Sequence, residues 1–279
     1  MDHNMDPTTT DFPTPPLVMR IRDALGSESP QARGEQKLAA ALQWLFSFHK
    51  TSPGILRQVV GVQAAGYARQ LQRRGLVEIY QTTSLRGGLV VMLTTTGVAL
   101  AEGLLPEFAG RYDPRWSSVR PQLLVHDLAC QVALLSIRRK TKVYRYLPEH
   151  LAGLADTTGV KRADIMVWLT PDTPGQLWTP WGIEVERTAK RIGQELDTTL
   201  VRAARAVERN RVVGQIFVFI NEPVLRLYQT TLAKPLPLWE KDRVSGKWRD
   251  RGERWTVPGE IQKRFQWLHR PDLLRPLLP

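Results

Sequence analysis

The chain has 279 residues, of which 42% are hydrophobic and 24% charged, a composition typical of a soluble globular protein with room for two domains. Its 39 Lys and Arg against 27 Asp and Glu give a formal net charge of +12, which favours a polyanionic partner such as nucleic acid. One cysteine, Cys130, excludes a disulfide framework and a cysteine-ligated zinc site, and no apolar run reaches the roughly 18 residues that membrane insertion requires.

Residues 1–33 are rich in Pro, Thr and Asp and poor in apolar side chains, so we predict a disordered N-terminal segment. The segment does not begin with a basic stretch followed by an apolar one, as a signal peptide would. We therefore expect a cytoplasmic protein.

Residues 34–105 predict a winged-helix domain. Apolar residues at helical spacing mark a first helix over residues 35–49, and Ser52-Pro53 is a typical start for a second helix that runs to about residue 60. A third helix begins near Val62. Two strands follow at residues 77–82 and 89–94, joined by a turn with two glycines, and a closing helix covers residues 97–104.

The third helix has the pattern of a DNA-recognition helix, with small and apolar residues such as Ala68, Leu71 and Gly75 on one side and long polar or basic residues on the other. The alternative is a winged helix that contacts protein, in which case its arginines would need acidic partners. The predicted DNA-binding residues are Gln63, Arg69, Gln70, Arg73 and Arg74 on the helix and Arg86 at the tip of the hairpin.

Residues 106–121 contain three prolines and are predicted to form a linker. A second domain is expected over residues 122–233. Its predicted order is a helix, three strands, a helix, a strand and a helix, which is typical of an α/β/α layered domain. The helices are expected at 122–138, 188–209 and 221–232, and the strands at 142–147, 165–169, 177–185 and 212–220.

Acidic residues lie within these strand segments. Asp164 opens one apolar run, while Glu184 and Glu186 share one face at the end of the next strand, so we expect the three carboxylates to converge. Clustered carboxylates repel one another unless a divalent cation neutralises them, and their hard oxygen atoms suit Mg²⁺ or Mn²⁺. Lys190, one helical turn beyond Glu186, could orient a water or stabilise a transition state. The alternative is that the carboxylates contact solvent or pair with Lys161, Arg162 and Arg187.

Asp164 followed by Glu184-x-Glu186 before a helix resembles the PD-(D/E)XK nuclease core. The sequence departs from that pattern by carrying Glu186 where most members have Lys, and Lys190 matches members whose Lys lies on the following helix. The order of modules, with His126 near the start of a helix, resembles the replication-relaxation family and MobC-type plasmid relaxases. The resemblance implies a restriction-endonuclease-like domain in which Asp164 and Glu184 bind metal and His126 lies near the active site. A packing role for His126 remains the alternative.

Residues 234–279 form a basic, tryptophan-rich C-terminal extension. Aromatic rings among Lys and Arg are able to stack on unpaired bases, or they dock the extension onto the preceding domain. Both interpretations remain open. The rings are Trp239, Trp248, Trp255, Phe265 and Trp267.

Together these features predict a DNA-binding endonuclease that depends on Mg²⁺ or Mn²⁺, with Asp164, Glu184, Glu186, Lys190 and His126 as catalytic candidates. The resemblance implies nicking or processing of plasmid or integrative-element DNA at an origin of transfer or replication. Expected partners are double-stranded DNA, single-stranded DNA, and relaxosome or coupling proteins. The alternative function is a catalytically inactive DNA-binding relaxosome protein or transcriptional regulator.

Overall fold

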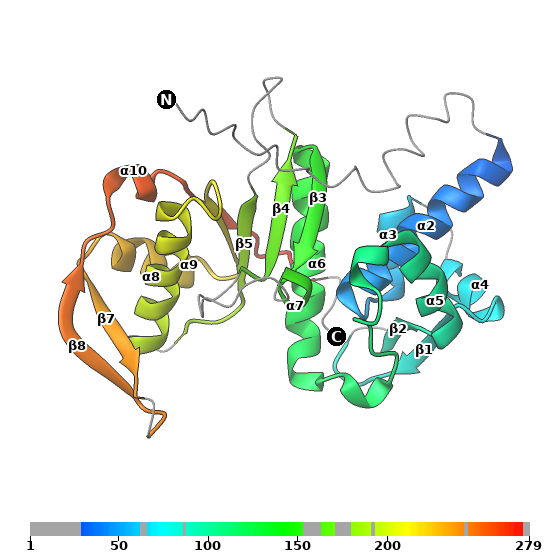
Figure 1. Cartoon of the computed structure of the whole chain (residues 1–279), viewed down its shortest axis with the longest axis horizontal. Helices are drawn as coiled ribbons and strands as arrows, with labels where there is room; N and C mark the ends of the chain where they lie inside the picture. The colour runs from blue at the N-terminus through cyan, green and yellow to red at the C-terminus, as the bar shows by residue number, and fades with distance from the viewer. Residues whose placement is uncertain are drawn as a thin grey trace, which may run out of the picture.

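The computed structural model describes residues 29–61, 66–85, 88–152, 163–170, 180–190, 193–242 and 245–275. In these residues helices and strands combine into a mixed α/β protein with several sheets (Figure 1). None of the helices so described is both long and apolar enough to cross a membrane. Residues 1–28 of the predicted disordered segment lie outside the description, whereas residues 30–33 already belong to a helix.

The N-terminal unit contains helices around a two-stranded antiparallel hairpin. Side chains cap two of the helices: Ser52 Oγ accepts a hydrogen bond from the Ile55 amide, as the Ser52-Pro53 start predicts, and Thr94 Oγ1 accepts one from the Gly97 amide, so that the closing helix begins at Thr95, two residues before the predicted start. The elements are α2 (Pro30–Phe48), α3 (Pro53–Val60), α4 (Tyr67–Arg73), β1 (Val77–Gln81), β2 (Leu89–Leu93) and α5 (Thr95–Leu104).

The segment that we predicted as a linker, residues 106–121, is packed against this unit. It contains the short 3-10 helices η1 (Pro106–Phe108) and η2 (Trp116–Ser118). The buried Tyr112 hydroxyl donates to the His49 carbonyl and accepts from the Leu93 amide at 2.9 Å. Trp116 stacks on Tyr80 of the hairpin with ring centroids 4.7 Å apart. These contacts fix the path of the segment over the unit.

Helix α6 (Pro121–Lys140) lies at the centre of the molecule, between the N-terminal unit and a large sheet (Figure 1). Its buried residues occur on several sides, as expected of a helix packed between two layers. Fully buried Gln131 joins the layers: it accepts from the Trp44 indole at 2.8 Å and from the Thr51 hydroxyl at 2.7 Å. The N-terminal unit and the sheet therefore share one core cluster through α6.

The central sheet has five strands in the order β3-β4-β5-β6-β9. The first two pairs are antiparallel and the last two are parallel. Helix α6 covers one face, while α8 (Gln194–Glu208) and α9 (Glu222–Leu232) cover the other (Figure 1). The strands are β3 (Val143–Pro148), β4 (Ile165–Leu169), β5 (Trp181–Glu186), β6 (Gln215–Phe219) and β9 (Phe265–His269), and the short helix α7 (Glu149–Ala152) follows β3.

The C-terminal residues are integrated into this domain. Strand β9 completes the sheet, and the hairpin of β7 (Leu236–Lys241) and β8 (Trp248–Trp255) lies beside α8, followed by α10 (Gly259–Gln262). Trp267 stacks on Phe217 with ring centroids 5.3 Å apart. The Trp239 indole donates to Asp197 of α8 at 3.2 Å. These two rings dock the segment onto the domain, as one of the two interpretations of the sequence expected.

Candidate functional site

The predicted catalytic residues lie around one end of the central sheet, where β4 begins and β5 finishes. The antiparallel register pairs Ile165 with Ile183. Continuing this register by one residue places Asp164 opposite Glu184, because residues on antiparallel strands pair in opposite order. The backbone therefore brings two of the predicted carboxylates to neighbouring strand ends although 20 residues separate them in the sequence.

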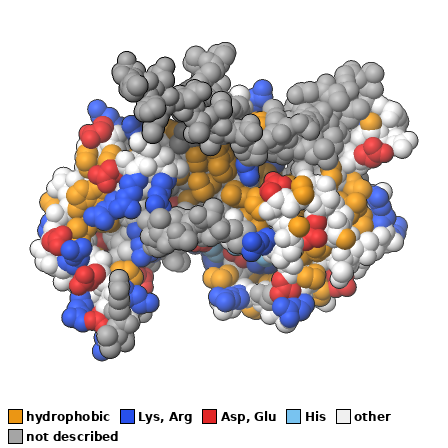
Figure 2. All heavy atoms as spheres, viewed as in Figure 1, with side chains coloured by type: hydrophobic (Ala, Val, Ile, Leu, Met, Phe, Trp, Pro, Cys, Tyr) orange, Lys and Arg blue, Asp and Glu red, His pale blue; other side chains and the backbone are white. Residues whose placement is uncertain are grey.

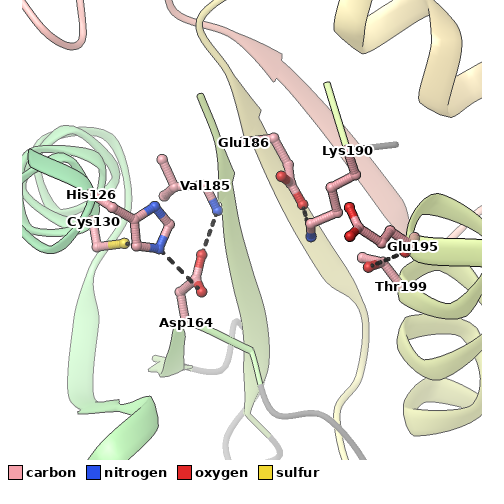
Figure 3. Close-up of polar contacts among 8 residues, drawn as sticks. All are labelled: His126, Cys130, Asp164, Val185, Glu186, Lys190, Glu195 and Thr199. Carbon is pink, nitrogen blue, oxygen red and sulfur yellow. Dashed lines mark hydrogen bonds and ion pairs between the residues drawn. The ribbon is translucent and has the colours of Figure 1, made fainter. Parts of the chain in front are cut away.

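The Asp164 side chain turns toward α6. Its Oδ2 accepts a hydrogen bond of 2.8 Å from the Val185 amide, and its Oδ1 lies 3.5 Å from His126 Nε2 (Figure 3). Asp164 immediately precedes β4, so the alternation of side chains along a strand does not determine the direction of its side chain. The Val185 amide instead fixes the direction of its carboxylate, whose side chain is only 11% exposed.

His126 and Cys130 complete this group from α6. They are four residues apart and so lie on the same side of the helix, with Cys130 Sγ 3.6 Å from His126 Nε2. Burial lowers the pKa of His126, but the hydrogen bond and charge of Asp164, helped by Asp127 and Glu186, raise it above the usual value on balance. The sequence singled out His126, whereas a cysteine-ligated zinc site was excluded because Cys130 is the single cysteine.

Glu184 and Glu186 lie on the opposite face of the sheet from α6. Their neighbours Ile183 and Val185 belong to the core beneath α6, whereas both glutamates are 5% exposed and pair in register with Phe217 and Phe219, which face α8 and α9. Lys190 Nζ donates to Glu186 Oε1 at 2.5 Å, on the far side of β5 from Asp164 (Figure 3). Lys190 therefore compensates one of the two buried charges.

The phenol of Tyr228, on α9, is buried and its pKa is raised. Burial is the largest cause that raises the pKa of its phenol, and the negative charges of Glu186, Glu184 and Asp164 raise it further, in that order. All three predicted carboxylates therefore act on one buried position beneath α9.

The structure differs from the expectation that the three carboxylates converge on one ion. Within the described residues, the group of His, Cys, Asp and Glu side chains whose ligand atoms all lie within 4.8 Å consists of His126, Cys130 and Asp164. The reason is the pairing of Asp164 with the Val185 amide, which directs its carboxylate to the α6 face while strand alternation keeps Glu184 and Glu186 on the other. The spacing His126-x-x-x-Cys130 on a helix was the sequence signal for this group.

A cavity of about 240 Å³ opens beside His126, Cys130 and Asp164, between α6 and the end of α2. His49 and His150 also line it, with ring centroids 4.2 Å apart. Burial is the main cause that lowers the pKa of His49 to about 4 and that of His150 to about 3, so both imidazoles are neutral at pH 7. The remaining lining residues are Phe48, Lys50, Asp127, Pro148 and Glu149, of which Lys50 and Asp127 form an ion pair at 2.6 Å.

Helix α4 presents the predicted DNA-binding face. Ala68 and Leu71 are buried, as predicted, whereas Gly75 is exposed and has a left-handed backbone with φ of 69° just after the helix, so it does not belong to the inward stripe. No ion pair within the described residues engages the arginines of this face. The exposed members are Arg69, Gln70, Arg73 and Arg74, whereas Gln63 and Arg86 lie outside the described residues.

The β1–β2 hairpin is packed more closely against the rest of the protein than α4 is. Leu85, in the loop between the strands, is 5% exposed and joins the core cluster of α6. The hairpin therefore packs against the molecule, and α4 offers the more accessible surface for a ligand. Figure 2 shows Lys and Arg side chains over both ends of the molecule, which spreads the positive potential beyond this one helix.

Comparison with protein-family models and with curated proteins gave no match for this chain. Function must therefore be inferred from the geometry and charge of the residues described above.

Proposed function

We propose that the chain is a DNA-binding endonuclease that depends on Mg²⁺ or Mn²⁺, with a winged helix over residues 34–105 joined to a PD-(D/E)XK-like core. The observation that carries the proposal is the placement of Asp164 opposite Glu184 at one sheet end, with Glu186 on the same strand as Glu184 and paired with Lys190. The N-terminal order of three helices, a hairpin and a closing helix supports the first part.

The order of elements supports the second part. Helix α6, the antiparallel strands β3, β4 and β5, helix α8 and the parallel strand β6 follow the helix, strands, helix and strand order that the resemblance implies. The sheet places the Asp and the Glu-x-Glu segment on adjacent strands. A slip of β5 by one residue would move Glu184 to the α6 face, so the register itself is part of the site.

The donor set fits a hard divalent cation by its chemistry. Asp164, Glu184 and Glu186 supply carboxylate oxygens, both glutamates are buried, and Lys190 offsets one of the three charges. Asp164 and Glu184 would hold the ion, and a bound ion would supply an activated water and stabilise charge on a phosphate. For this to occur the Asp164 carboxylate must rotate from its contact with His126 toward Glu184.

The other residues have separate tasks in this proposal. Lys190, held by Glu186, positions an ammonium near the reacting phosphate, where it stabilises developing negative charge. The contact of His126 with Asp164 raises the pKa of the imidazole against the effect of burial and so favours its protonated form. Arg69, Arg73 and Arg74 on α4 bind phosphates of a duplex and so bring the backbone to the sheet end.

The resemblance extends the proposal to a relaxase-like role on plasmid or integrative-element DNA at an origin of transfer or replication, with single-stranded DNA and relaxosome or coupling proteins as further partners. The test is incubation of supercoiled plasmid with the purified chain and Mg²⁺ or Mn²⁺. We expect nicked circles that disappear on chelation. Glu184→Gln should abolish the nicking while duplex binding persists.

One observation favours a second candidate, an inactive DNA-binding protein of a relaxosome or a regulator. Lys190 already holds Glu186, and Asp164 is directed away from both glutamates, so the carboxylates serve as a charge-compensated scaffold in this alternative. The same assay separates the two candidates. Duplex binding without nicking in either metal supports the inactive protein.

A further inference from the structure

Three side chains of different chemistry meet at the α6 face of the sheet end. His126 Nε2 lies 3.6 Å from Cys130 Sγ and 3.5 Å from Asp164 Oδ1 (Figure 3). All three ligand atoms lie within 4.8 Å of one another. The nitrogen, the sulfur and the oxygen therefore surround one small volume at the edge of the cavity.

This arrangement differs from a Cys-His-Asp catalytic triad. In a triad the nucleophile contacts one ring nitrogen and the carboxylate contacts the other, so that the imidazole relays between them. Here Cys130 and Asp164 both contact Nε2 of His126. A single nitrogen cannot donate its one proton fully to both groups, so the geometry favours an ion shared by three donors over a proton relay.

The distances match those of a tetrahedral zinc site. With bond lengths of about 2.0 to 2.3 Å, a tetrahedral zinc ion separates its nitrogen and sulfur ligands by about 3.5 Å and its nitrogen and oxygen ligands by about 3.3 Å. The two distances around Nε2 differ from these values by only a few tenths of an ångström. Small side-chain rotations are sufficient to complete the set.

Neighbouring groups hold the donors in these positions. The Val185 amide binds Asp164 Oδ2 at 2.8 Å, which leaves Oδ1 directed at the shared volume, as an outer-shell hydrogen bond does in known metal sites. Helix α6 fixes the spacing of His126 and Cys130. The cavity lies on the remaining side, where a fourth ligand such as water has room.

We propose that His126, Cys130 and Asp164 bind a borderline transition-metal ion of the zinc type, with a fourth position open to the cavity. A thiolate and an imidazole select such an ion over Mg²⁺, which prefers oxygen ligands alone. This site is distinct from the proposed nuclease centre in donor type and sheet face, although both use Asp164. Its existence does not require that the chain cleave DNA.

The composition of the chain makes the proposal directly testable. Cys130 is the single cysteine of the sequence, so any bond between a metal and sulfur must involve it. The experiment is a titration of the tag-free, reduced, full-length chain with Co²⁺ alone, followed by optical absorption. We expect one equivalent of Co²⁺ to produce a thiolate-to-cobalt charge-transfer band and the intense visible bands of a four-coordinate ion, and Zn²⁺ to displace both.

Variants assign the ligands. Cys130→Ser should remove the charge-transfer band, and His126→Gln and Asp164→Asn should each weaken Co²⁺ binding at least 10-fold while circular dichroism shows an intact fold. Glu184→Gln is the matched control, because it removes a buried carboxylate on the other face of the sheet, and it should leave the spectrum unchanged.

Two results would overturn the proposal. One is a folded wild-type chain that gives no charge-transfer band at saturating Co²⁺. The other is an equal loss of the band in Glu184→Gln, which would place the ion elsewhere. Neither result depends on nicking, and failure of nicking in Mg²⁺ or Mn²⁺ leaves the cobalt spectrum as an independent readout of this site.

Discussion

The two faces of the central sheet surround their polar side chains with different neighbours. On the α6 face, Asp164 meets an imidazole and a thiol beside a cavity. On the α8 and α9 face, Glu184 and Glu186 lie among aromatic rings, and an ion pair with Lys190 compensates one of them. The first face offers mixed, polarisable donors with room for a ligand, whereas the second offers hard oxygen atoms in a packed layer.

This difference shows that the direction of one side chain at a strand end determines which groups a carboxylate contacts. Strand alternation places the side chains of Glu184 and Glu186 on the face covered by α8 and α9. Asp164 precedes β4, so alternation does not set the face on which its side chain lies. Of the three predicted carboxylates, Asp164 is therefore the one whose side-chain direction is not set by strand alternation. Substitutions confined to one face should separate the two sets of functions.

The largest effect is expected from Asp164→Asn, which removes the charge that both faces share. Loss of several kcal/mol of metal-linked stabilisation corresponds to a decrease in nicking of about 1000-fold or more. Glu184→Gln should match it in nicking but keep cobalt binding, whereas Cys130→Ser should keep nicking and lose the cobalt spectrum. The measurement is the rate of plasmid nicking in Mn²⁺ for all three variants.

The separation of functions between the two faces is contradicted if Cys130→Ser abolishes nicking as fully as Glu184→Gln does while the protein remains folded. The two faces would then form a single site, and the direction of Asp164 toward α6 would be its working state. A Glu208→Gln variant, on the exposed end of α8, provides the control for general effects of charge removal.

The sequence predicted the order of elements well because each leaves a local signal. The Ser52-Pro53 start of α3 and the apolar run that Asp164 opens in β4 depend on neighbouring residues only. The burial of α6 on several sides was not predicted. One of the two layers that pack against α6 comes from α2 and α3, more than 60 residues earlier, and no local sequence pattern encodes such a contact.

For the candidate site, the sequence identified Asp164, Glu184 and Glu186 as acidic residues within strands, but it did not predict the face on which each lies. The direction of Asp164 depends on a hydrogen bond to Val185, on another strand. A cysteine-ligated zinc site was excluded because the chain has one cysteine, whereas Cys130 lies with His126 and Asp164 in a mixed group of potential ligands. Tertiary contacts, which sequence spacing does not contain, decided both points.

Acid should destabilise the α6 face selectively, because His49 and His150 are buried beside its cavity and kept neutral. Their pKa values of about 4 and about 3 lie below the unfolded value of 6.5, so the unfolded chain binds more protons as the pH falls from 6.5 toward 4. Stability should fall over that window, by about 2 kcal/mol for each imidazole between pH 7 and pH 5.

Urea unfolding at pH 7 and pH 5 measures this change, and the double variant His49→Asn, His150→Gln should lose most of it. Asn suits position 49, whose backbone φ is 61°. Nearby Lys50, Asp113 and Asp127 also contribute to the field at His49, so the variant is compared with the wild type at each pH. An equal acid sensitivity in both proteins would show that the two imidazoles do not control it.

A smaller effect is expected at α4, which tests whether DNA binding is independent of both faces of the sheet. Replacing Arg69, Arg73 and Arg74 with Ala removes three cations, so the slope of log affinity against log salt should flatten by up to about 3 units. Over a fourfold rise in salt this corresponds to about a 40-fold smaller loss of duplex affinity.

Fluorescence anisotropy with a labelled duplex at four salt concentrations measures this slope. The matched control is Arg226→Ala, which removes an exposed arginine of α9 that is paired with Glu222. If the triple variant binds with unchanged affinity and salt dependence while folded, α4 contacts protein instead of DNA, and the phosphate-binding surface must lie elsewhere on the basic chain.

The smallest effect is expected from the rings of β8, which test whether the C-terminal hairpin belongs to the packed α8 face or binds bases. Arg202 lies over Trp248 at 5.6 Å and Arg205 over Trp255 at 5.4 Å, so both rings are engaged by cations of α8. Each Trp→Ala change should cost about 1 kcal/mol. The melting temperature should fall by roughly 2 to 4 °C, with single-strand binding unaltered. Trp→Phe is the control because it keeps a ring beneath each guanidinium. Loss of about 1 to 3 kcal/mol of single-strand affinity without a change in melting temperature would instead assign these rings to base stacking.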